Sequence, residues 1–181
     1  MKHPTRWIAL GVAIVVALVA VVLATQVGGD PRADATKSQL VGEPAPAFSV
    51  RTLDGERVSL ADLAGKSVLV NFWNTWCPPC KAELPALKSF AKAHGQDPDF
   101  ELVGIVRDDS ERAVKAYGPG QEIDWTIGMD PGARAALAFG TRGQPETFAI
   151  TPDGLVAGAQ IGPSTREDLE TLLDAARGSG S

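Results

Sequence analysis

The pattern of apolar and polar positions divides the chain into a long apolar head, a polar stretch and a dense remainder. The head is an uncharged run from Trp7 to Val27. Residues 28–41 are polar and contain Gly, Asp and Pro, which is typical of a tether between folded parts. From position 42 onward, strand-like and helix-like patterns alternate. We therefore predict a single domain over residues 42–177 and a frayed Gly-Ser tail over residues 178–181.

The apolar head predicts a membrane anchor over residues 1–27. The uncharged run would span roughly 31 Å as a helix, which is enough to cross a hydrocarbon core of about 30 Å. Lys2 and Arg6 precede it and no basic residue follows at once, so the N-terminus should lie in the cytoplasm and the domain outside. A cleaved signal peptide is the alternative, although Ile8–Ala24 exceeds the usual apolar length of about 7–15 residues. Both interpretations deliver the domain to the extracytoplasmic side; the first makes it a single-pass protein of the cell membrane.

Within the domain, the alternation of strands and helices predicts an α/β sandwich on a mixed sheet. The almost continuous apolar run Ser67–Trp73 is typical of a central strand buried on both faces. Helical spacing of apolar residues predicts a helix over Pro78–His94. Ser164, with Glu167 three residues later, has the capping-box spacing of a helix that runs through Ala176. Further strands are predicted at Phe48–Arg51, Arg57–Leu60, Phe100–Val106, Trp125–Met129, Thr147–Ile150 and Leu155–Ile161, and further helices from Ser110 to about Gly118 and over Pro131–Phe139.

Composition narrows the class of protein. The chain is 44% hydrophobic and 22% charged, which is typical of a globular protein. The net charge of −5 gives no indication of nucleic-acid binding. The two cysteines stand three positions apart, so a bond between them would restrain little of the unfolded chain. A chemical role explains this pair better than a structural one.

The cysteine pair lies where the central strand gives way to the next helix. Unpaired N–H groups and the positive dipole end of that helix would stabilise a thiolate on Cys77, and lower its thiol pKa below about 8.5. Pro78 and Pro79 fit the first helical turn, where a missing N–H donor costs nothing. Cys80, one turn further, would attack a mixed disulfide formed at Cys77. We therefore predict a redox-active disulfide between Cys77 and Cys80.

Half of a zinc site is the main alternative for this pair. Zinc needs four ligands, usually Cys or His, and the only histidines are His3 and His94. An inert cysteine pair is a second alternative. Neither explains two prolines at a strand-to-helix junction, so no metal and no cofactor are expected.

Three separated segments resemble the TlpA/ResA/DsbE (CcmG) family of membrane-anchored thioredoxin-like proteins. They are Val41–Phe48, Asn71–Pro85 with the Cys-Pro-Pro-Cys motif, and Gly143–Ile150, which is most similar to the cytochrome-maturation branch. The match covers roughly residues 41–176. The resemblance implies a thioredoxin-like fold with an N-terminal β-hairpin extension and extracytoplasmic thiol–disulfide exchange.

The resemblance also implies roles for two residues near the cysteines. Pro145 would follow a cis peptide bond and pack beside the two sulfurs, whereas an ordinary trans proline opening a strand is the alternative. Glu83 would tune the buried cysteine and relay protons, whereas a solvated helix glutamate is the alternative. Asn71 stands where thioredoxins carry a buried Asp, so Glu83 would substitute for that acid.

A client chain should contact the residues around the pair. We expect Trp76, Pro78 and Pro79 on the cysteine side of this contact. Gln144 and Glu146 would form the other side, beside the proline. Gln144 departs from the Thr or small aliphatic residue common in the family, and for Glu146 a plain strand-surface role is the alternative.

These expectations combine into a protein-disulfide reductase. Its client would be a protein disulfide such as that of apocytochrome c before haem attachment, and its electrons would come from a thiol–disulfide donor in the membrane. A disulfide-forming oxidant and a membrane-tethered binding module without redox turnover are the alternatives. Peroxiredoxins share the Val-Gly-x-Pro-Ala-Pro-x-Phe opening, but their Pro-x-x-x-Thr-x-x-Cys pattern is absent from this sequence.

Overall fold

The computed structural model describes residues 12, 14–19 and 38–178. It divides the chain into two units, Met1–Thr36 and Lys37–Ser181. In the first unit the described residues are helical, and no helix among the described parts of the chain is both long enough and apolar enough to cross a membrane. Most of the predicted anchor, most of the predicted linker and the last three residues lie outside the described residues. The anchor therefore stays a prediction.

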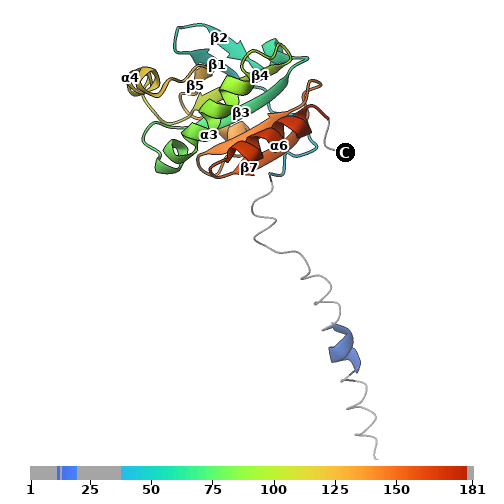
Figure 1. Ribbon diagram of the computed structural model, residues 1–181. Coiled ribbons are helices and arrows are strands. Elements are labelled where there is room, and N and C mark those ends of the chain that lie inside the picture. Colours follow the sequence, from blue (N-terminus) through green and yellow to red (C-terminus); the bar gives the residue numbers. More distant parts are fainter. Residues whose placement is uncertain (1–11, 13, 20–37, 179–181) are drawn as a thin grey trace, which may run out of the picture. The chain divides into compact units, whose positions relative to one another are not determined.

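The second unit is built on one mixed sheet with the strand order β2-β1-β5-β4-β3-β6-β7 (Figure 1). β3, β4 and β5 run parallel, and the remaining neighbours pair antiparallel. The strands are β1 Ser49–Thr52, β2 Arg57–Ser59, β3 Ser67–Trp73, β4 Phe100–Val106, β5 Thr126–Met129, β6 Glu146–Ile150 and β7 Val156–Ile161. The helices are α3 Pro78–His94, α4 Glu111–Gln121, α5 Arg134–Ala138 and α6 Arg166–Ala176, with a 3-10 turn η1 over Leu60–Leu63.

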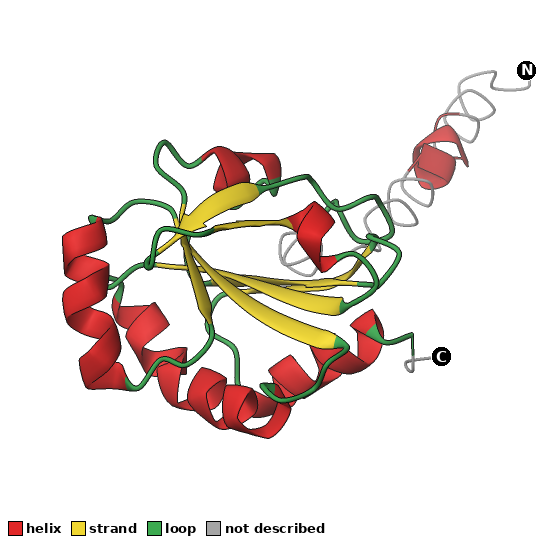
Figure 2. Cartoon of the chain, turned by 90° about the horizontal axis from the view of Figure 1, so that it is seen from above, coloured by secondary structure: helices red, strands yellow, loops and turns green. Residues whose placement is uncertain are grey.

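Helices cover both faces of this sheet (Figure 2), which is why β3 is buried at all seven of its positions. On one face α3 and α6 enclose a core that includes Leu69, Phe90 and Leu173. On the other face Phe72 and Phe148 pack in a core that α5 and η1 close. The thioredoxin-like α/β sandwich predicted from the sequence is confirmed.

A third, smaller cluster surrounds the cysteines. It joins Trp73 at the end of β3 and Val106 at the end of β4 to Val114 of α4, with Cys77 and Cys80 among them. The carboxyl ends of the parallel strands therefore meet the start of α3 at one edge of the sheet. This edge carries the candidate site.

The N-terminal hairpin extends the sheet as predicted. β1 pairs with β2 across the turn at residues 53–56, and β1 also pairs with β5. Arg51 lies opposite Met129 in that second pairing. The hairpin is therefore part of the central sheet and widens it by two strands.

The bounds of three helices differ from the predictions. α5 covers Arg134–Ala138 and not Pro131–Phe139, because the left-handed backbone of Ala133 precedes its first residue. α4 continues past Gly118 to Gln121 and ends where Glu122 takes a left-handed backbone conformation. The capping box of α6 is formed by Thr165 and Asp168, whose side chains bond each other's backbone N–H groups. The prediction that Ser164 and Glu167 form this box was wrong: both pairs have the same spacing, and Ser164 is drawn into the interior by another contact.

Candidate active site

Cys77 and Cys80 lie at the N-terminus of α3, joined by a disulfide. Cys77 is the N-cap residue, with an extended backbone, and its Sγ accepts a hydrogen bond from the backbone N–H of Cys80 at 3.2 Å. Pro78 and Pro79 occupy the first two helical positions. Because the two prolines carry no N–H, the donor that the first turn directs at Cys77 Sγ is the N–H of Cys80. This bond and the positive end of the helix dipole would stabilise a thiolate on Cys77.

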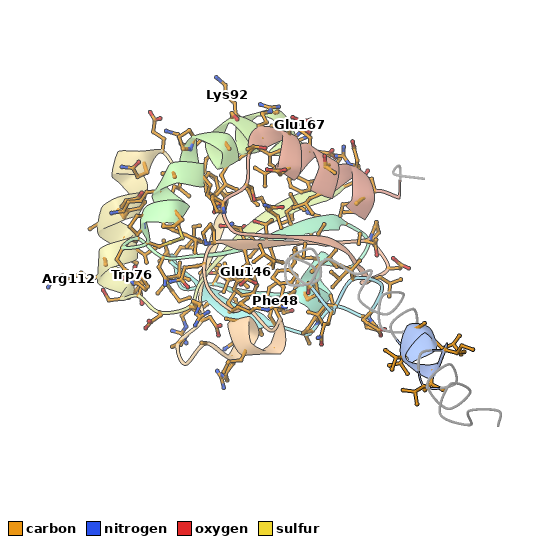
Figure 3. All side chains as sticks on the ribbon, turned by 90° about the horizontal axis from the view of Figure 1, so that it is seen from below. Phe48, Trp76, Lys92, Arg112, Glu146 and Glu167 are labelled. Atoms are coloured by element: carbon orange, nitrogen blue, oxygen red, sulfur yellow. A yellow bond between two sulfur atoms is a disulfide. The ribbon has the colours of Figure 1, made fainter. Side chains whose placement is uncertain are left out.

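Both cysteines are almost completely buried. Cys77 is only 3% exposed and Cys80 5%. Pro78 and Pro79 are exposed beside them, and Trp76 is 52% exposed at the outer edge of the domain (Figure 3). Trp76, Pro78 and Pro79 therefore form an exposed strip beside Cys77, along which a client could approach.

The loop before β6 completes this strip. The Gln144–Pro145 peptide bond is cis, as the family resemblance implied. The carbonyl oxygen of Gln144 lies 3.6 Å from Cys77 Sγ, although the two residues are 67 positions apart. Pro145 itself is buried. The backbone just before the proline thus offers a carbonyl to a client strand next to the reacting sulfur.

Glu146 does not contact this strip, contrary to the prediction that it binds clients. It is 2% exposed and lies within the body of the domain (Figure 3). Its Oε1 accepts hydrogen bonds from the backbone N–H groups of Arg142, at 2.7 Å, and Gly143, at 2.9 Å. The alternative of a plain strand-surface role is wrong as well, because all five residues of β6 are buried. Glu146 therefore positions the proline loop.

Arg107 is a site residue that sequence reasoning missed. Its Nη1 donates to Thr141 Oγ1 at 3.2 Å and to the carbonyl oxygen of Gly143 at 3.5 Å. Arg107 directly follows β4, so it reaches the loop from a strand that the sequence does not link to it. The sequence did contain a signal for Arg107: it is a polar residue directly after a buried parallel strand, and sites in α/β sheets form at that end of the strands.

Glu83 is buried one turn beyond Cys80, with 2% exposure. Its two carboxylate oxygens accept hydrogen bonds from Asn71 Nδ2 and from the backbone N–H of Ser164, both at 2.9 Å. Asn71 donates in addition to Thr147 Oγ1 at 3.0 Å. The solvated-glutamate alternative is therefore wrong, and the contact with Glu83 is what draws Ser164 inward.

Burial governs the acidity of this carboxyl. Loss of solvation raises the pKa of Glu83 to about 7, although the bonds from Ser164 and Asn71 lower it in part. Glu83 and Cys80 line the same enclosed cavity of about 10 Å³, together with Asn71 and Trp73, and this volume admits about one water molecule. A carboxyl that titrates near neutral pH beside a buried cysteine can exchange a proton with its thiol.

The histidine considered as a zinc ligand lies elsewhere. His94 closes α3 at the end opposite the cysteines, and its Nε2 lies 2.9 Å from Glu170 Oε2. Among the described residues, no group of three or more His, Cys, Asp or Glu side chains could hold a metal ion. Around Cys77 and Cys80 the structure therefore shows a disulfide at a helix start, with the buried carboxyl of Glu83 on the cavity that Cys80 also lines.

Comparison with known proteins decides the family. The model of the AhpC/TSA family matches residues 41–159. The chain is 34% identical over 141 residues to a thiol-disulfide oxidoreductase ResA of Bacillus cereus, covering 78% of this chain and 80% of that protein. The chain belongs to the AhpC/TSA family, in its group of ResA- and DsbE-like thiol–disulfide oxidoreductases.

Solved structures agree with this assignment. A thiol:disulfide interchange protein of the thioredoxin family from Chlorobium tepidum TLS has a TM-score of 0.65 and 36% identity, covering 74% of this chain and 94% of that one. A secreted disulfide oxidoreductase of Mycobacterium tuberculosis, described as homologous to Escherichia coli DsbE, has a TM-score of 0.62 and 26% identity, covering 71% and 95%. The chain is thus a thiol–disulfide oxidoreductase, and Cys77 and Cys80 are the only two cysteines in its sequence.

Proposed function

We propose that this oxidoreductase is a reductant of client disulfides outside the cytoplasm, anchored in the cell membrane by its N-terminal segment. The client class is a protein disulfide such as that of apocytochrome c before haem attachment. The observation that carries the proposal is the segment Gly143–Phe148, which resembles the cytochrome-maturation branch in sequence and presents the Gln144 carbonyl beside Cys77. The relatives named ResA and the structure described as homologous to DsbE support the same branch.

The reaction follows from the order of the two cysteines along α3. The thiolate of Cys77 attacks one sulfur of the client disulfide, forming a mixed disulfide and releasing the other client sulfur as a thiolate that takes a proton from water. Cys80 then loses its proton and attacks Cys77 Sγ. The second client sulfur leaves as a thiolate and takes a proton from water. The client has then gained two electrons, and the protein holds the Cys77–Cys80 disulfide.

Glu83 has a defined place in the second step. Cys80 is 5% exposed, so its thiol proton needs an acceptor within the domain. The Glu83 carboxylate shares a cavity with Cys80, and its pKa of about 7 leaves about half of it able to accept a proton at neutral pH. In the reverse direction, the same carboxyl would return the proton when the pair is reduced again.

Turnover then requires two electrons from outside the domain. A membrane-bound dithiol donor would supply them by attacking the Cys77–Cys80 disulfide, and an anchor would keep the domain beside that donor.

The surface of this protein that contacts a client would consist of Trp76, Pro78, Pro79 and the Gln144 carbonyl. These are the exposed or partly exposed groups that border Cys77.

The direction of exchange is tested by the reduction potential of the full-length chain, because 30 mV shifts the balance by about 1.4 kcal/mol. A value nearer to about −270 mV, the thioredoxin end, than to about −120 mV is expected. In cells, Cys77 and Cys80 should be held largely as thiols. A mainly disulfide-bonded resting form with an oxidising potential would instead support a disulfide-forming oxidant.

A further inference from the structure

Residues 74–76, the segment before Cys77, are hydrogen-bonded to the loop between β4 and α4. Asp109 Oδ2 accepts hydrogen bonds from the backbone N–H of Thr75, at 2.9 Å, and from Thr75 Oγ1, at 2.6 Å. The carbonyl oxygen of Asp108 accepts from Trp76 Nε1 at 2.8 Å, and the N–H of Asp108 donates to Asn74 Oδ1 at 3.3 Å. Four hydrogen bonds therefore join residues 74–76 to residues 108–109.

The Asp109–Thr75 pair is a tertiary contact. Two other aspartates bond the N–H and hydroxyl of one residue in the same way: Asp168 with Thr165 and Asp62 with Ser59. In both of those pairs the partners are three residues apart and cap the start of a helix. Thr75 and Asp109 are 34 residues apart, so local chain geometry does not produce their contact. It exists because two loops meet at the rim of the active site.

These hydrogen bonds fix the orientation of the Trp76 side chain. This side chain is 52% exposed, yet its ring nitrogen is held by the Asp108 carbonyl and its preceding residue by Asp109. Rotation of the ring would break the first bond, so the apolar ring face stays fixed at the border of Cys77. Trp76 directly precedes Cys77 and is exposed, whereas Cys77 is only 3% exposed, so a client chain bound at Cys77 would lie beside this ring.

We propose that Asp109 is a positioning residue that holds Trp76 as a rigid platform and thereby selects clients with an aromatic or large apolar side chain next to the reacting cysteine. The inference rests on the proposed function in one respect, namely that the substrates are protein disulfides. A fixed aromatic ring favours stacked or edge-on contacts with an apolar partner. A mobile ring would lose that preference, because each client would have to order it anew.

The test compares three disulfides with the full-length chain in detergent. Two are synthetic peptides with one intramolecular disulfide each, identical except that Phe or Ser stands beside one cysteine; the third is 2-hydroxyethyl disulfide. Wild type that has been reduced beforehand and freed of reductant should reduce the Phe peptide with a higher second-order rate constant than the Ser peptide. Asp109→Ala and Trp76→Ala should each reduce this preference, by up to about tenfold if the two lost hydrogen bonds of Asp109 act through Trp76. The double variant should show no further loss, because both changes act on one contact.

Asp62→Ala is the matched control, since it removes the same pair of hydrogen bonds, those from the N–H and hydroxyl of Ser59, at the start of η1. It should keep the preference for the Phe peptide. If Asp109→Ala proves unstable, Asp109→Asn replaces it in the test. This variant retains an acceptor oxygen and should keep part of the preference for the Phe peptide. An equal fall for all three disulfides, or an unchanged Phe-to-Ser ratio in Asp109→Ala, would overturn the inference. Failure of wild type to reduce either peptide while it reduces 2-hydroxyethyl disulfide would instead refute the proposed function.

Discussion

At the scale of single residues, the site contains two buried carboxyl groups with different roles. Glu146 is buried and accepts two backbone N–H groups of the proline loop, so its work is positional. Glu83 is equally buried, but its pKa is raised to about 7, so it can change protonation during turnover. Asn71 donates a hydrogen bond to Glu83. An acidic residue at position 71 would instead compete with Glu83 for one proton.

Glu83→Gln should change the dependence of stability on pH in the disulfide form, in which the cysteines do not titrate. The unfolded chain loses the Glu83 proton near 4.5 and the folded chain near 7. The folded state therefore binds more protons between these values, and the wild-type free energy of unfolding falls as pH rises through that window, by at most about 3 kcal/mol. Urea unfolding from pH 4 to 8 should show this fall in wild type and a flatter profile in Glu83→Gln.

The same variant should slow exchange near neutral pH. Without the carboxyl, the Cys80 proton has no buried acceptor, and the resolving step should slow by roughly one to two orders of magnitude. Stopped-flow kinetics of client reduction across the same pH range measures this step. A wild-type pH–rate profile would show that Glu83 does not carry the proton.

The two cysteines should behave unequally. Only Cys77 has its sulfur at the helix N-terminus, so Cys80→Ser should accumulate a mixed disulfide with clients and Cys77→Ser should not. The Cys77 thiol should titrate below about 8.5. Non-reducing gels and iodoacetamide kinetics provide the two measurements, and trapping by Cys77→Ser instead would reverse the assigned roles.

At the scale of elements, β4 explains how two indole rings fit beside the cysteine cluster. Gly104 lies in this buried strand, and a Cβ there would meet Trp73 Nε1 at 2.8 Å, Trp125 Nε1 at 3.2 Å and Ile127 Cδ1 at 2.8 Å. The glycine is thus required by close approach of side chains from β3 and β5. Its absence of a side chain allows Trp73 to pack against the cluster that contains Cys77.

Gly104→Ala should therefore destabilise the domain by about 1–3 kcal/mol, because a methyl group overpacks this layer. Gly120→Ala is the control: it lies in helix α4 with no atom within 4 Å of the added Cβ, and should be neutral or slightly stabilising. Chemical denaturation of both variants measures the difference. Equal free energies of unfolding for Gly104→Ala and Gly120→Ala would contradict the prediction, because they would mean that the indole rings move aside without loss of stability.

At the scale of the whole molecule, the charges and the head segment suggest where the protein works. The run Trp7–Val27 follows Lys2 and Arg6, and most of it lies outside the described residues. We expect a single anchor with the redox domain outside the cytoplasm. Protease added to intact, wall-stripped cells should degrade the domain, and membrane fractionation should recover the untreated full-length chain. A domain that is protected until the membrane is broken would contradict this topology.

The sequence alone determined the parts that depend on local periodicity. Ser67–Trp73, Pro78–His94 and Phe100–Val106 were predicted with the bounds that the structure shows, because a buried strand and an amphipathic helix are both encoded in consecutive residues. The Cys77–Cys80 pair was equally visible, since its chemistry requires only the spacing and the helix start. The capping box of α6 was misplaced by one residue, because two overlapping pairs satisfy the same local rule.

Only the tertiary structure decided which polar groups work together. Glu83 meets Ser164 from 81 residues away, Cys77 meets Gln144 from 67, and Thr75 meets Asp109 from 34. No local pattern predicts such contacts, because they arise where loops from separate strands converge at one sheet edge. For the same reason the pKa of Glu83 could not be inferred from the sequence: it depends on desolvation, which packing alone produces.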